Sequence, residues 1–335
     1  MVLGVGAGAV AGHPLARLAL ALDPTPIPAT VSAGEIAQIR TAARLFSTWD
    51  HTYGGGLVRE AVAAQLRYSA ALLETRCAPG LRPDLFSAVG QLGHVTGFMA
   101  FDAAAHADAQ RMFRFALACA EEATDWHLRA KVLSSMARQA IWVGDPDTGL
   151  TLTELALVRA DRLTATERAM LLAARARALA KLHRVQDTLT TVGLVDEAFS
   201  ATDPTVDPAW MGYYDHAQHA GDTGHALFDL AVEGRFVTEA NDRLSVAVDG
   251  HTDAYARSRG ISGLKLASLT MVTGDPHQAV AIADRAAVDL GPVRSRRAAQ
   301  DMDEVHQFAA NHDHLDDVAD LRHRLPALAA GPRPG

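Results

Sequence analysis

The chain has 335 residues, 49% of them hydrophobic and 21% charged, with a formal net charge of −8 at pH 7. Ala and Leu are abundant and aromatic residues make up only 6%, so the composition favours helices and predicts an all-α protein. The negative charge argues against the phosphate attraction that underlies most nucleic-acid binding, and we expect no direct binding of nucleic acid by this chain.

Residues 1–31 are expected to form a leader or linker that is poorly ordered or truncated. The start is apolar enough to suggest a secretory signal, and export is the alternative. However, it lacks a basic segment, and His13, Pro14 and Arg17 interrupt it before a membrane-spanning length of roughly 20 residues. The prolines of DPTPIP then predict an extended connector. Since the two cysteines fit neither a disulfide framework nor a metal spacing, we expect a cytoplasmic protein without membrane association.

Residues 32–82 are predicted to form an N-terminal helical cap. Ser32 and Glu35 fit a capping box, and the helix that follows has one apolar face formed by Ile36, Ile39, Ala43 and Phe46. A second helical pattern begins near residue 57. The stretch TWDHTYGGGLVREA, residues 48–61, therefore lies between two helices.

The three glycines of this stretch predict a sharp corner, because glycine supplies the positive φ angles that a reversal needs. They are not followed by the Lys and Ser or Thr of a phosphate-binding loop. We expect Trp49 and Tyr53 to pack around the corner and Asp50 to accept hydrogen bonds from loop amides. An anion at the next helix N-terminus, beside Arg59, is an alternative. A DNA-reading helix is disfavoured, because its face is mostly Val and Ala.

Residues 83–330 repeat a pattern of small and large side chains at an interval of about 40 residues. Gly97, Ala100, Ala109, Phe113 and Ala116 recur as Ala137, Ala140, Gly149, Thr153 and Ala156. Small residues let two antiparallel helices approach closely, and the Gly-Asp-Pro turns at Gly144 and Gly274 end one helix and start the next. Such pairs bury their apolar faces by stacking, so the pattern predicts a solenoid with a concave surface.

The repeat spacing resembles that of tetratricopeptide repeats, although their usual period is shorter, about 34 residues. The segments 49–62 and 125–182 resemble the sensor half of actinobacterial regulators, in which a Cro/repressor-type helix-turn-helix domain precedes a tetratricopeptide-like domain. The resemblance covers roughly residues 32–325, and no DNA-binding domain is visible before residue 32. It implies a right-handed α-solenoid of helix pairs with an N-terminal cap, acting as a non-enzymatic ligand- or partner-binding sensor and forming a homodimer.

In proteins that resemble tetratricopeptide repeats, set positions of each first helix line the concave groove. This resemblance assigns to the groove Gln91, His94, Phe98, Lys131, Ser134, Arg138, Arg177, Met211, Asp215 and Gln218. Lys131, Arg138 and Arg177 are expected to cluster and attract a carboxylate or phosphate of a small molecule or peptide. A solvated or ion-paired helix face is the alternative for these three cations. Trp126, Trp142 and Trp210 are expected in a pocket or in the core.

No catalytic residue, cofactor or metal site is predicted. Asp215, His216 and His219 suggest a divalent metal, but the sequence lacks His-Glu-x-x-His, and exposed polar residues beside a turn are the simpler interpretation. Two other functions stay open. One is an enzyme of small-molecule, secondary-metabolite biosynthesis on a regulator-like scaffold, with His94, Arg138, Asp215 or His219 as acid-base groups. The other is a protein adaptor or homodimer scaffold.

Overall fold

The computed structural model describes residues 25–54, 59–291 and 295–330. The prediction of an all-α protein is confirmed for these residues, whose only strands are the paired β1 (Thr30–Val31) and β2 (Arg76–Cys77), two residues each. Residues 1–24 of the expected leader and residues 55–58 of the glycine corner lie outside the described part. No helix within the described ranges is both long and apolar enough to cross a bilayer.

The N-terminal helices follow the amphipathic pattern of the sequence. Helix α2 (Ala33–Tyr53) begins with the predicted capping box: Ser32 Oγ accepts from the Gly34 amide at 3.1 Å, and the Glu35 carboxylate accepts from the Ser32 amide at 2.8 Å. The predicted face of α2 is buried. Gly54 follows α2 with a φ of 79°, and α3 (Arg59–Ala71) starts after the corner, so the glycines lie between two helices as predicted. Two short 3₁₀ turns, η1 (Leu72–Glu74) and η2 (Pro79–Leu81), complete this region.

The side chains beside this corner were expected to pack around it or to bond to its amides. Trp49 and Tyr53 are 39% and 48% exposed, and their packing around the corner stays a prediction, because residues 55–58 lie outside the described part. Asp50 is buried, and its carboxylate accepts from Arg257 at 2.8 Å, 207 residues later in the chain. The expectation considered only local partners, whereas a buried carboxylate needs a strong donor wherever the fold supplies one.

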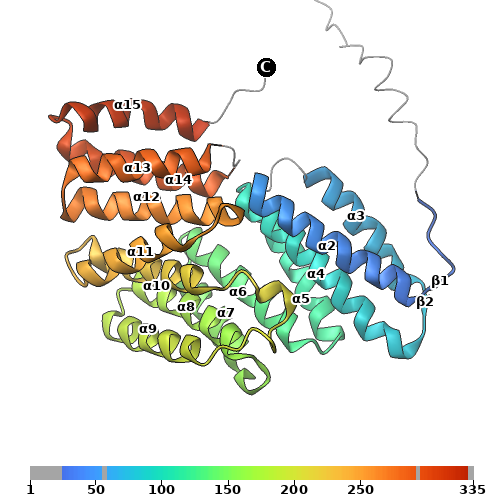
Figure 1. The fold of residues 1–335 in the computed structure, drawn as a ribbon. Coiled ribbons are helices and arrows are strands. Elements are labelled where there is room, and N and C mark those ends of the chain that lie inside the picture. Colours follow the sequence, from blue (N-terminus) through green and yellow to red (C-terminus); the bar gives the residue numbers. More distant parts are fainter. Residues whose placement is uncertain (1–24, 55–58, 292–294, 331–335) are drawn as a thin grey trace, which may run out of the picture.

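The rest of the chain forms successive helices that pack mainly against their sequence neighbours (Figure 1). They are α4 (Arg82–Asp102), α5 (His106–Glu122), α6 (Trp126–Trp142), α7 (Pro146–Leu157), α8 (Ala165–Lys181), α9 (Val185–Ser200), α10 (His216–Ala231), α11 (Val237–Gly250), α12 (Ala256–Thr273), α13 (Pro276–Leu290), α14 (Arg296–Ala309) and α15 (Asp316–Ala330). The connections also contain η3 (Ala160–Arg162), η4 (Ala209–Met211), η5 (Asp253–Tyr255) and η6 (Ala310–His312). Each even-numbered helix from α4 to α12 packs on the following odd-numbered helix and on the next even-numbered one.

Four turns between successive helices repeat one hydrogen-bonding geometry. Ala104, Thr124, Gly144 and His183 have φ between 53° and 87°, and each is followed by an amide that donates to the carbonyl five positions earlier. The Asp125 amide, for example, donates to the Ala120 carbonyl at 2.9 Å. This bond is that of a Schellman motif, which satisfies the last carbonyls of a helix and reverses the chain sharply.

Small residues are buried where the helices of a pair cross. A Cβ added at Gly97 would lie 2.7 Å from the Phe113 ring, and one added at Gly149 would lie 2.6 Å from Ile141. Both predicted small positions therefore mark close contacts between the two helices of a pair, as the repeat pattern requires.

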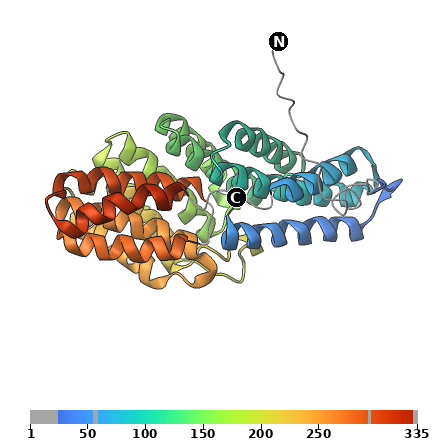
Figure 2. The ribbon, with the colours of Figure 1, turned by 90° about the horizontal axis from the view of Figure 1, so that it is seen from above.

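A buried ion cluster joins the early helices to the late ones. Asp102, at the end of α4, accepts from Arg297 Nη2 at 2.8 Å and lies 3.2 Å from Arg257 Nη1, while Arg257 also pairs with Asp50 of α2. Ser295 Oγ adds a hydrogen bond to Asp102 at 2.9 Å. The cluster brings α2 and α4 next to α12 and α14, as the views in Figures 1 and 2 show.

Candidate ligand-binding cavity

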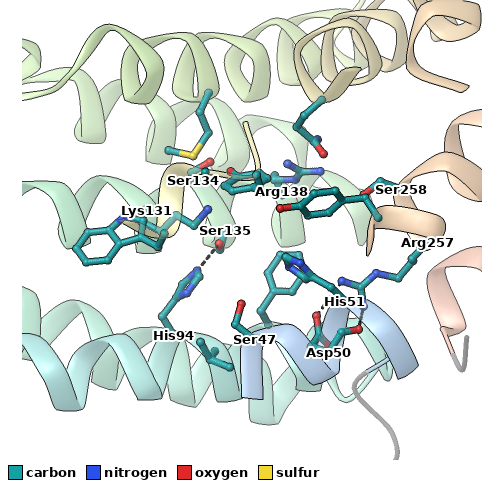
Figure 3. A pocket seen from close by; sticks show the side chains of 18 of the residues that line it. Ser47, Asp50, His51, His94, Lys131, Ser134, Ser135, Arg138, Arg257 and Ser258 are labelled. Carbon is teal, nitrogen blue, oxygen red and sulfur yellow. Dashed lines mark hydrogen bonds and ion pairs between the residues drawn. The ribbon is translucent and has the colours of Figure 1, made fainter. Parts of the chain in front are cut away.

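The even-numbered helices from α2 to α14 surround a cavity of about 590 Å³, which is large enough for a metabolite-sized molecule. Residues of α4, α6, α8, α10 and α12 form its wall, and α2, η5 and the segment before α10 cover it. In Figure 3, Lys131 and Arg138 point into the cavity from α6, opposite His94 of α4 and His51 of α2.

Most of the residues predicted for the groove lie around this cavity. They are Gln91, His94, Phe98, Lys131, Ser134, Arg138, Arg177 and Gln218. Met211 and Asp215 do not line it: Met211 is buried in a hydrophobic cluster, and Asp215 caps α10 by accepting from the Gln218 amide at 2.9 Å. The repeat register extended the helix backwards through both positions, whereas α10 starts only at His216 because Asp215 is its N-cap.

Arg138, Lys131 and Arg177 converge on the cavity, as predicted, but differ in how their charges are balanced. Arg138 Nη1 lies 3.4 Å from the Asp222 carboxylate, which raises the pKa of Arg138. Among the described residues, neither Lys131 nor Arg177 has a carboxylate within ion-pair distance, and Arg177 Nε is buried without a hydrogen-bond acceptor. The cavity therefore holds positive charge that the described residues do not neutralise.

Burial shifts the pKa values of these two cations. Lys131 keeps a small accessible surface because it faces the cavity, yet protein surrounds it, and burial followed by the neighbouring Arg138 lowers its pKa to about 7. The same two causes lower the pKa of Arg177. Aromatic rings partly replace the missing carboxylates: Lys131 Nζ lies 3.7 Å from the centre of the Tyr213 ring, and the Arg177 guanidinium lies 5.7 Å from that of Trp142.

The sequence-based groove omitted several residues that line the cavity. Asp222 lies one helical turn after Gln218, so the helical period alone could have identified it. No comparable signal exists for His51, Tyr213 or Arg257, which come from a cap helix, a loop and the start of α12. Arg257 is already paired with Asp50 and Asp102. These aspartates leave it little charge to offer a ligand.

The histidines around the cavity are held in the neutral form. Burial, followed by the Lys131 charge, lowers the pKa of His94 to about 3, and burial followed by the Arg257 charge lowers that of His51 to about 4. His94 Nε2 and Ser135 Oγ share a hydrogen bond of 2.8 Å. Burial also lowers the pKa of His225 well below its ordinary value. A cation-rich cavity and protonated imidazoles would repel one another, so the neutral forms are the stable ones.

Apolar and aromatic groups form the remaining wall. Phe98, Trp142 and Trp210 line the cavity, and Trp126 lies outside it against a hydrophobic cluster. The Trp210 Nε1 hydrogen is buried without an acceptor among the described residues. The cavity therefore combines apolar surface with the side chains of Lys131 and Arg177, which suits a molecule that has an anionic end and an apolar body.

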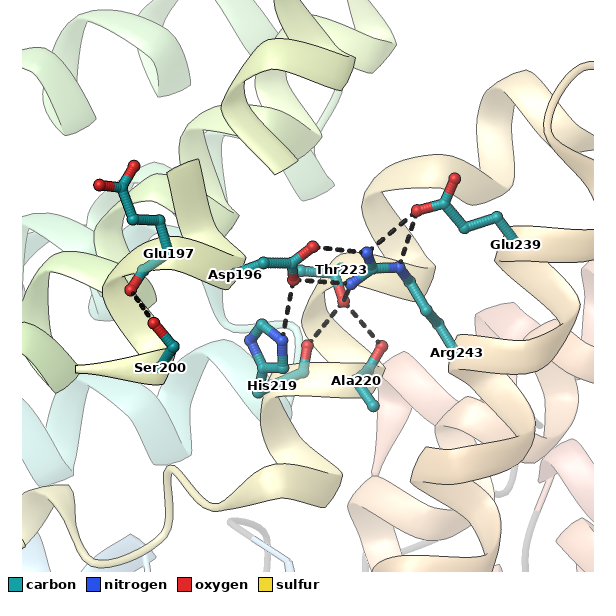
Figure 4. A network of polar contacts seen from close by, with 8 residues as sticks. All are labelled: Asp196, Glu197, Ser200, His219, Ala220, Thr223, Glu239 and Arg243. Atoms are coloured by element: carbon teal, nitrogen blue, oxygen red, sulfur yellow. Dashed lines mark hydrogen bonds and ion pairs between the residues drawn. The ribbon is translucent and has the colours of Figure 1, made fainter. Parts of the chain in front are cut away.

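Of the three residues considered for a metal site, Asp215 caps α10 and His219 belongs to a polar network away from the cavity. His219 Nε2 lies 3.0 Å from Asp196 Oδ1 and its ring stacks on Phe199, while Arg243 holds the same carboxylate at 2.7 Å (Figure 4). These bonds link α9, α10 and α11. Across the described ranges, no group of three or more His, Cys, Asp or Glu residues is arranged to hold a metal ion.

Comparison with protein-family models, with curated protein sequences and with solved structures finds no match to this chain.

Proposed function

We propose that this chain is a ligand-binding sensor module whose cavity takes a small organic anion with an aromatic or otherwise apolar body. The observation that carries this proposal is the pair of cavity cations, Lys131 and Arg177, that have no carboxylate partner among the described residues. A ligand carboxylate or phosphate would supply the missing charge in a place where water screens it weakly. The adjacent Trp142 and Phe98 would contact the apolar body.

The resemblance to regulator sensor domains supports a regulatory role for such binding. The pairing of successive helices and the row of even-numbered helices along the cavity support a tetratricopeptide-like solenoid, and its right-handed twist is what the resemblance implies. Because α2 and α12 both border the cavity, a ligand that contacts both helices would favour one arrangement of the early and late helices over another. That shift in population is the proposed signal.

The test is a binding panel with matched variants. We expect the protein to gain thermal stability with an aromatic carboxylate such as 4-methylbenzoate, and to release that molecule chemically unchanged. The Arg177→Gln variant should bind this carboxylate about 10- to 100-fold more weakly, because one charge-assisted hydrogen bond is lost. Calorimetry would measure the two affinities.

The control is Arg235→Gln, which changes an exposed arginine in the turn before α11 and should leave the affinity unaltered. Equal stabilisation by neutral and anionic members of the panel would contradict the proposal. Chemical conversion of the ligand that is lost in Arg138→Gln would favour the enzyme instead.

A further inference from the structure

The three lysines of the chain have different environments. Lys181 Nζ lies 2.5 Å from the Asp229 carboxylate, and Lys265 Nζ lies 2.7 Å from Glu304 and 3.0 Å from Asp301. Lys131 has no such partner in the described part of the chain, although it projects into the cavity of about 590 Å³. An amine without a carboxylate in a cation-rich cavity is less stabilised in its charged form than the other two.

The groups around Lys131 favour an uncharged amine. Burial and Arg138, two turns further along α6, lower its pKa to about 7, so a large fraction of Lys131 is a free amine near neutral pH. Asp222 and Glu167 act in the opposite direction but do not cancel these effects. Titratable or charged groups of several other elements surround this site: His51 of α2, His94 of α4, Glu167 and Arg177 of α8, Tyr213 of the loop after η4, and Asp222 of α10.

We propose that Lys131 is a nucleophile that captures the carbonyl group of an oxo acid, an aldehyde- or ketone-bearing carboxylate, as a reversible Schiff base in this cavity. This inference rests on the proposed function, because the carboxylate of the same molecule would be held by Arg177 and Arg138. It names the ligand class more narrowly: an anion that also carries a carbonyl.

The reaction balances without an oxidant or reductant. The Lys131 Nζ lone pair attacks the carbonyl carbon, and the electrons of the C=O π bond move to oxygen. A proton passes from nitrogen to that oxygen to give a carbinolamine, and loss of water then forms the C=N bond. Addition of water reverses each step and releases the ligand. The hydrogen-bonded pair of Ser135 and His94 lies beside the amine, and the three side chains point toward one another in Figure 3. The Ser135 hydroxyl can exchange protons with the carbinolamine oxygen.

The experiment uses 4-formylbenzoate, which carries an aldehyde and a carboxylate on one ring, with cyanoborohydride to reduce any imine to a stable adduct. At pH 7.5 an amine with a pKa of about 7 has a free-amine fraction on the order of a thousandfold larger than an ordinary lysine. We therefore expect one adduct per chain, placed on Lys131 by peptide mass spectrometry, forming at least about tenfold faster than on Lys181 or Lys265. Its rate should rise as the pH increases through 7.

Two variants separate capture from binding. Lys131→Arg places a permanent positive charge at this position but cannot form the imine, so it should lose the adduct and still bind 4-methylbenzoate, which has no aldehyde or ketone group. Lys181→Arg should keep both properties. Equal labelling of the three lysines, or an unchanged adduct yield in Lys131→Arg, would overturn the proposal. Binding of 4-methylbenzoate without any adduct from 4-formylbenzoate would refute Schiff-base capture alone, whereas absence of both would refute anion binding as well.

Discussion

At the scale of single residues, the cavity is defined by charges that the fold leaves unbalanced. Arg257 and Arg297 are also buried at its edge, but Asp50 and Asp102 neutralise them. Lys131 and Arg177 lie in the same enclosure without carboxylates among the described residues, and their pKa values fall as burial dictates. A structural role alone would have favoured partners like those of Lys265, so the contrast points to a ligand.

Anion binding should therefore depend on pH through Lys131. Its pKa in the empty protein is about 7, and a bound carboxylate raises it, so binding above pH 7 takes up a proton and the affinity falls as the pH rises. We expect 4-methylbenzoate to bind about tenfold more weakly at pH 8.5 than at pH 6.5 by calorimetry. His51 and His94, with pKa values of about 4 and 3, stay neutral across this range and do not contribute.

Lys131→Arg provides the matched control, because arginine does not titrate in this range. Its affinity for the anion should be nearly the same at both pH values. A wild-type affinity that does not change with pH would show that Lys131 is not near the bound charge.

At the scale of helices, stability depends on close approach within each pair. Gly97 of α4 lies against Phe113 of α5, where a Cβ would be 2.7 Å from a ring carbon of a fully buried side chain. A Cβ added at Gly193 of α9 would have no neighbouring atom within 4 Å. Substitution by alanine should therefore change the stability of the protein in opposite directions at the two glycines.

Gly97→Ala should lower the free energy of unfolding by about 1–3 kcal/mol, the usual cost of overpacking a core. Gly193→Ala should raise it by up to about 1 kcal/mol, because alanine is the better helix former and meets no neighbour. Urea titrations of both variants would measure these changes. Destabilisation by both would contradict the assignment of Gly97 as a contact position and Gly193 as a free one.

At the scale of the whole molecule, the buried ion cluster holds the early and late helices together. Asp102 has no exposed surface, and its carboxylate faces two guanidinium groups from α12 and α14. Burial opposes its ionised form, but Arg257 and Arg297 outweigh burial and hold the pKa of Asp102 below its ordinary value. This stabilisation is present above the unfolded pKa and is lost as the pH falls through the folded pKa.

Asp102→Asn should lower the free energy of unfolding by about 3–5 kcal/mol, because it leaves the buried Arg297 without its main counter-charge. The exposed Asp249 of α11 has no ion pair in the described structure, so Asp249→Asn should change stability by less than about 0.5 kcal/mol. Chemical denaturation of the two variants tests the difference. A small effect of Asp102→Asn on the free energy of unfolding would show that the ion cluster does not hold the early and late helices together.

The sequence by itself determined the helical class, the two helices on either side of the glycine run and the close contacts within helix pairs, because these depend on local periodicity, capping and small residues at contact positions. The resemblance to tetratricopeptide repeats, applied to the repeat period of this sequence, placed Lys131, Arg138 and Arg177 on one face, and all three line the cavity. The period failed at Met211 and Asp215, where an irregular connection precedes α10.

Only the tertiary structure decided which charges have partners. Asp50 meets Arg257 across 207 positions, while Lys131 is left with an aromatic ring. Such pairings depend on how the whole array of helices brings its early and late members together. That arrangement results from many long-range contacts, which no local sequence pattern predicts.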